Sequence, residues 1–131
     1  MSEAVVRQAV DAFMARDLDG ILAVSDDEIV LRSLLTEAER PLYYGFDGVR
    51  DWFDNVFGVF PDWLPQPRPA SLDEDGAVVV GLDVTATGAG SGAPVDQIYW
   101  LGAQVRGGKI KFFGFFRTEE DALEGVSAPP T

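Results

Sequence analysis

The sequence of 131 residues contains neither cysteine nor histidine. The absence of cysteine excludes disulfides, thiolate metal sites and cysteine nucleophiles. The absence of histidine removes the commonest general base and the commonest zinc ligand. Only an all-oxygen site for a hard cation would remain, and the acidic turn at residues 73–76 is too short for a calcium-binding loop. We therefore expect neither a metal site nor a cofactor.

Basic residues are scarce as well, because 10 Lys and Arg stand against 22 Asp and Glu, a net charge of −12. This balance argues against nucleic acid and against anionic membrane surfaces as partners. No apolar run approaches the roughly 18 residues of a membrane span, and the start of the chain lacks the pattern of a signal peptide. We expect a cytoplasmic protein with no nucleic-acid or membrane partner.

The chain has the length of one domain, and its hydrophobic content of 47% is enough for a folded core. We predict a single domain over residues 1–125 and a flexible tail over 126–131.

Two helices follow from hydrophobic residues at helical spacing. The first covers residues 2–15 and starts at a capping Ser2; one further turn at 21–24 ends at 25–27. The second begins near Gly48 with Asp47 as its cap. Its apolar stripe is the clearest in the chain: Val49, Trp52, Phe53, Val56 and Phe57. A short last helix is expected at 119–124, between a Thr118 cap and Gly125.

Four stretches have the composition of strands: residues 29–35, 77–87, 94–106 and 109–117. A Gly107-Gly108 turn is predicted to join the last two. Residues 60–69 hold four prolines and are interpreted as a loop that carries large aromatic side chains over an opening. Strands in hairpin succession after helices imply an α+β fold. We predict a strongly curved antiparallel sheet of four to six strands, wrapped around the N-terminal helices as a cone with an internal pocket.

The last predicted strand is apolar on both faces. Side chains alternate along a strand, so Phe112 and Phe116 point one way, and Phe113 and Phe115 the other. One layer of helices covers only one face of a sheet. The other face needs a partner or a second layer, and we predict a homodimer through it.

Four stretches carry a family resemblance by their order and spacing. They are residues 15–20 with 25–27, the aromatic-Gly-x-x-Gly-hydrophobic-Arg start of a helix at 44–50, the glycine-rich hairpin at 88–92, and Gly-Lys-Ile at 108–110 followed by Phe116 and Ala-Leu at 122–123. In these stretches the chain resembles the SnoaL-like branch of the nuclear-transport-factor-two-like superfamily, which has the cystatin-like cone fold.

This resemblance implies a cone with a binding cavity. The superfamily includes polyketide cyclases, ketosteroid isomerase, limonene epoxide hydrolase, dehydratases and members with no known reaction. Its enzymes place an Asp or His in the cone as acid or base, with Tyr, Asp or Arg as partner. This chain departs from that pattern: it has no His, and Gly114 and Phe116 stand where relatives often carry polar residues.

Asp83, Arg32 and Tyr99 are the candidate catalytic residues. If the strand face of Asp83 lines the cavity, desolvation raises its pKa and it can act as acid or base. Otherwise that face meets solvent, with Leu82 and its neighbours toward the core. Arg32 is either a clamp for a ligand oxygen or an ion-pair partner of Asp83, or it points outward.

Tyrosine hydroxyls are a second group of candidates. Tyr99 or Tyr44 could polarise a ligand carbonyl, or be core residues with satisfied hydroxyls. Gln97 shares the face of Tyr99. The carboxylates of residues 26–28 could project into the mouth of the cone or be ordinary turn residues.

Further ligand contacts are expected from large aromatic side chains, which either wall an apolar cavity or fill the core. They are Trp52, Phe57, Phe60, Trp63, Trp100, Phe113 and Phe116. Together these features predict a protein that binds a small, largely apolar ligand, aromatic or polycyclic, in the cone. Two alternatives stay open. One is a cofactor-free isomerase, cyclase, hydrolase or dehydratase that uses Asp83 with Tyr99, Tyr44 or Arg32; the other is a module that docks a protein through its aromatic sheet face.

Overall fold

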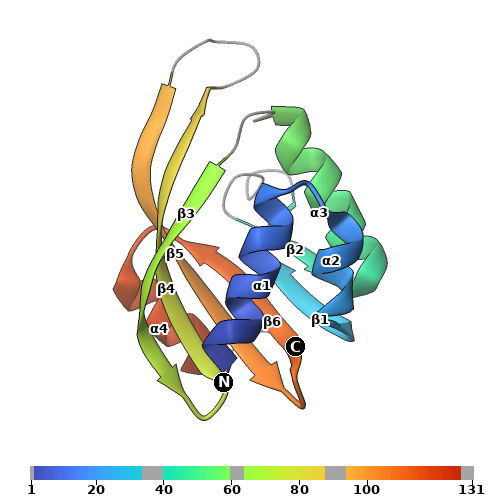
Figure 1. Cartoon of the computed structure of the whole chain (residues 1–131), viewed down its shortest axis with the longest axis vertical. Helices are drawn as coiled ribbons and strands as arrows, with labels where there is room; N and C mark the ends of the chain where they lie inside the picture. The colour runs from blue at the N-terminus through green and yellow to red at the C-terminus, as the bar shows by residue number, and fades with distance from the viewer. Residues whose placement is uncertain (1, 34–39, 60–63, 88–93, 128–131) are drawn as a thin grey trace.

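The computed structural model describes residues 2–33, 40–59, 64–87 and 94–127. Within these residues, three helices lie against one face of a sheet and a fourth against the other (Figure 1). In chain order the elements are α1 (Ser2–Met14), α2 (Leu18–Ala23), β1 (Ser25–Arg32), β2 (Leu42–Tyr44), α3 (Gly45–Val59), β3 (Leu64–Glu74), β4 (Ala77–Thr87), β5 (Pro94–Arg106), β6 (Lys109–Phe116) and α4 (Glu119–Ser127). The predicted α+β class is confirmed.

The six strands form one sheet in the order β2-β1-β6-β5-β4-β3. Consecutive hairpins join β3 to β6, and the Gly107-Gly108 turn falls where it was predicted. Register shifts between Pro67 and Ala70 and between Gln104 and Val105 add bends to the sheet. Neighbouring strands are antiparallel except β1 and β6, which run parallel.

Several predicted boundaries are wrong, among them the start of α2, which lies at Leu18 and not at residue 21. Residues 25–27 belong to β1 and do not end a helix. Helix α3 begins at Gly45, whose φ of +68° favours glycine; Asp47 lies in its first turn and pairs with Arg50 at 2.9 Å. Helix α4 continues past Gly125 to Ser127, because Val126 is buried against the sheet. The Thr118 cap is confirmed, since its Oγ1 accepts a hydrogen bond from the Asp121 amide at 3.1 Å.

The proline-rich stretch was predicted to be a loop, but from Leu64 on it is the edge strand β3. Pro65 and Pro67 lie two residues apart, so both missing N–H groups fall on the same side of the strand. Among the described strands only β4 pairs with β3, and the free side of an edge strand needs no donors. Residues 60–63 lie outside the described part.

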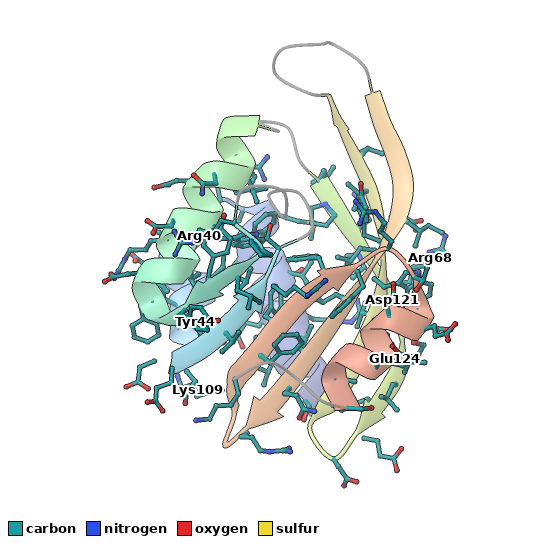
Figure 2. All side chains as sticks on the ribbon, turned by 180° about the vertical axis from the view of Figure 1, so that it is seen from behind. Arg40, Tyr44, Arg68, Lys109, Asp121 and Glu124 are labelled. Carbon is teal, nitrogen blue, oxygen red and sulfur yellow. The ribbon has the colours of Figure 1, made fainter. Side chains whose placement is uncertain are left out.

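The sheet separates two apolar clusters. We call the face toward α1, α2 and α3 the inner face, and the face toward α4 the outer face. Phe113 and Phe115 pack on the inner face; Phe112 and Phe116 pack on the outer face with Val126. The predicted alternation is therefore confirmed. Of the two predicted covers for the outer face, a partner or a second layer, the chain itself supplies the second layer, because α4 contacts β4, β5 and β6 (Figure 2).

Candidate ligand-binding site

The helices and the inner face enclose an apolar cavity of about 20 Å³. This volume suits a single water molecule, but a buried water needs two to four polar partners, so an apolar cavity stays dry. The residues that line the cavity come from both helical and sheet layers: Ala9, Val10, Phe13, Ile21, Ser25, Ile29, Leu31, Val49, Trp52, Pro65, Leu82, Ile110, Phe113 and Phe115.

A stack of aromatic rings forms one wall of this cavity. The ring centre of Trp52 lies 5.0 Å from that of Phe13 and 5.5 Å from that of Phe115, almost parallel to the latter at 19°. Phe113 meets Phe115 edge to face at 5.4 Å. Such offset and T-shaped contacts are the arrangements that aromatic quadrupoles prefer. The stack therefore joins α1, α3 and β6 around the cavity.

Several predicted contact residues lie on the inner side. Trp52 and Phe113 line the cavity. Tyr99 is buried on the inner face, since it pairs with Leu82, which also lines the cavity. Phe57 is half-buried and packs on Phe13 at 4.8 Å, with the Arg16 guanidinium 3.9 Å from its ring centre. The structure thus brings together part of the predicted aromatic wall.

The side chain of Asp83 points to the outer face, whereas that of Leu82 points to the inner face. Half of the Asp83 side chain is exposed. Arg68 donates two hydrogen bonds to its carboxylate, at 2.8 and 3.0 Å. These hydrogen bonds, with the attraction of the positive charge, hold the pKa of Asp83 below its ordinary range. The position matches the solvent-facing alternative, and an ionised carboxylate there cannot exchange a proton with a ligand inside the cone.

The other predicted polar residues do not meet Asp83 inside the cone. Arg32 is exposed on the outer face, with its guanidinium 5.6 Å from the ring centre of Phe116. Tyr44 is 53% exposed on the same face. Trp100 and Phe116 also belong to the outer cluster. Phe60, Trp63 and the side chain of Gln97 lie outside the described residues.

The carboxylates of residues 26–28 lie together at the start of β1 and do not line the cavity. Asp26 pairs with Lys111 at 2.9 Å, and this hydrogen bond lowers the pKa of Asp26. A cluster of this kind on a surface is ordinary.

Two residues were missed by sequence reasoning. Arg68 lay in the stretch interpreted as a loop. Ser25 was predicted to end a helix. It is 3% exposed, lines the cavity and donates its hydroxyl hydrogen to the Ile21 carbonyl at 2.8 Å. One signal was available: a serine four residues after a helical residue can bond back to that residue's carbonyl.

The model of the SnoaL-like domain family matches residues 6–119. The chain therefore belongs to this family, and the predicted resemblance is confirmed. Among curated proteins, no sequence matches the chain significantly.

Solved structures share the fold. An NTF2-like protein of unknown function from Burkholderia pseudomallei has a TM-score of 0.80 at 17% identity, over 97% of this chain and 98% of that one. TerC, co-crystallised with polyporic acid, has a TM-score of 0.78 at 16% identity over the same shares. A cystatin-fold protein from Novosphingobium aromaticivorans has 0.73 at 16%, over 88% of this chain and 97% of that one. At such identities the likeness shows the fold alone.

None of the helices in the described part of the chain is long and apolar enough to cross a membrane.

Proposed function

We propose that this chain binds a small, largely apolar aromatic molecule between its helical layer and the inner face of its sheet. The observation that carries this proposal is the apolar cavity with its aromatic wall, which no charged residue of the described part of the chain lines. A planar hydrocarbon ring stacks well on Trp52 and Phe115. TerC, of the same fold, was co-crystallised with a small molecule, which supports the proposal by analogy.

Binding requires the walls to move apart, because the cavity of about 20 Å³ holds no more than a water-sized molecule. A protein whose binding-competent state is a minor population binds with an affinity reduced by that fraction. We therefore expect weak affinity for a single-ring probe. Larger ligands that bury more apolar area gain about 0.8 kcal/mol per additional buried methylene.

The test uses toluene, titrated into the isotope-labelled protein and followed by amide chemical shifts. Saturable shifts are expected in the inner faces of β1 and β6 and in α3. Val10→Ile adds one methylene to the cavity lining and is expected to weaken binding about fourfold. Val30→Ile makes the same change in the outer cluster and should leave the affinity unchanged.

Shifts confined to the outer face, or equal affinity in Val10→Ile and Val30→Ile, would contradict the proposed site. Tyr99 remains a proposed ligand contact, supported by its buried position on the inner face. The enzymatic alternative finds no support in the described positions of Asp83, Arg32 and Tyr44, all of which face outward.

The predicted homodimer also remains a proposal, with a changed basis. Helix α4 covers Phe112 and Phe116, yet the exposed large hydrophobic side chains among the described residues all belong to the outer side: Tyr44, Leu64, Ile98 and Leu123. A second copy that covers them would bury this apolar surface.

Sedimentation equilibrium is expected to find a dimer that Ile98→Asp dissociates. Gln8→Asp, which adds the same charge at an exposed position of α1, should leave the dimer intact. A monomeric wild-type protein at all concentrations would refute this proposal.

A further inference from the structure

Ser25 is the one polar residue among the described residues that line the cavity. It opens β1, where it pairs with Ile110, and only 3% of it is exposed to solvent. A buried polar side chain beside an apolar cavity matters for selectivity, because in such surroundings a single hydrogen bond discriminates strongly between ligands.

The hydrogen-bonding capacity of the Ser25 hydroxyl is only partly used. Its hydroxyl donates to the Ile21 carbonyl at 2.8 Å. A serine hydroxyl has one hydrogen and two acceptor lone pairs. The hydrogen is already engaged with the Ile21 carbonyl, but the Oγ can still accept a hydrogen bond. Turning the hydroxyl toward a ligand acceptor would exchange one hydrogen bond for another. A ligand that donates would add a bond without breaking the existing one.

Charged ligands are disfavoured at the same place. The other lining residues that the structure describes are apolar, and burying an ion among them without a partner is costly. The net charge of −12 further opposes the approach of anions. A neutral ligand avoids both penalties.

We propose that the ligand is a neutral aromatic molecule with a hydrogen-bond donor, a phenol-type hydroxyl or an aniline-type N–H, which donates to the Ser25 Oγ. Ser25 is then the residue that selects such molecules over plain hydrocarbons. This inference rests on the proposed function, since it concerns the same cavity.

Phenol and toluene provide the test because they differ by a hydroxyl in place of a methyl group. The quantity measured is the ratio of their dissociation constants, toluene over phenol, from titrations followed by amide chemical shifts. Ser25→Ala is expected to lower this ratio about five- to tenfold, the value of one net hydrogen bond. Ser25→Thr retains the hydroxyl and should keep the ratio close to that of the wild type, even if its extra methyl weakens both ligands.

Ser33→Ala is the matched control, because Ser33 is the other buried serine of the described chain and does not line the cavity. It should leave the ratio unchanged. A measurement on the unaltered protein covers the case in which Ser25→Ala does not fold: pyridine, which accepts but does not donate, is expected to bind at least about tenfold more weakly than phenol.

The outcomes separate the two proposals. Toluene binding in the cavity with the same ratio in wild type and Ser25→Ala would overturn the role of Ser25 and leave the binding function standing. Pyridine binding as tightly as phenol would also overturn it. If neither toluene nor phenol binds in the cavity, both the function and the selectivity are refuted.

Discussion

Replacing Trp52 with alanine is expected to lower the free energy of unfolding by about 3–5 kcal/mol, the range for truncation of large buried aromatic residues. Trp52 is 2% exposed, and its ring touches Phe13 of α1 and Phe115 of β6. Its loss removes the ring that ties α3 to both neighbours, and the surrounding layers can collapse only partly. Urea unfolding followed by circular dichroism measures the change.

Trp100→Ala is the control for this experiment. Trp100 is only half-buried and packs at the outer cluster, so its removal should cost clearly less. Trp52→Phe keeps a ring in the stack and should fall between wild type and Trp52→Ala. The contradicting result is that Trp52→Ala lowers the free energy of unfolding no more than Trp100→Ala, with the same slope of that free energy against urea concentration in both variants. Such a result would show that the aromatic stack does not hold the helical layer.

Local sequence patterns, which involve residues close together along the chain, predicted much of this fold. The apolar repeat of α3 placed Trp52 toward the core, and the glycine pair at 107 and 108 located the last hairpin. Alternation along β6 correctly divided its four phenylalanines between the two faces. These features depend on local geometry, which is why the sequence alone reveals them.

Which face of the sheet looks inward could not be predicted in this way. Alternation groups Asp83 with one face and Leu82 with the other, but it does not say which face the helices cover. The usual guide, a polar outer face, fails here because α4 covers the outer face of β6. The sequence of α4 hardly indicated that this helix would cover the sheet, since its only buried residues are Ala122 and Val126.

The strand β3 and the role of Ser25 were missed for a related reason. Prolines argue against a strand only where a neighbour needs their N–H groups, and that depends on the position of the strand in the sheet. Ser25 lines the cavity because β1 lies beside β6, a parallel pairing between distant parts of the chain. Both features arise from tertiary pairing.

Gly125→Ala is expected to lower the free energy of unfolding by about 1–3 kcal/mol, the usual cost of overpacking. The opposite sign is normal in a helix, where alanine is about 1 kcal/mol better than glycine. Here a Cβ at residue 125 would lie 2.4 Å from the Phe116 ring. The ring cannot retreat, because it lies against Gly102 and Gly114, where an added Cβ would be 3.3 and 3.0 Å away. The three glycines thus form the slot that lets α4 seal the outer face.

Gly58→Ala is the matched control, since Gly58 is exposed in α3 and an added Cβ there would meet nothing within 4 Å. This variant should be stabilised by up to about 1 kcal/mol. Thermal and urea unfolding of both variants measure the two signs side by side. Equal stabilisation by the two substitutions would mean that α4 lies loosely on the sheet. Phe116 would then be open to solvent or to a partner chain, and the aromatic outer face would again need a cover from outside the chain.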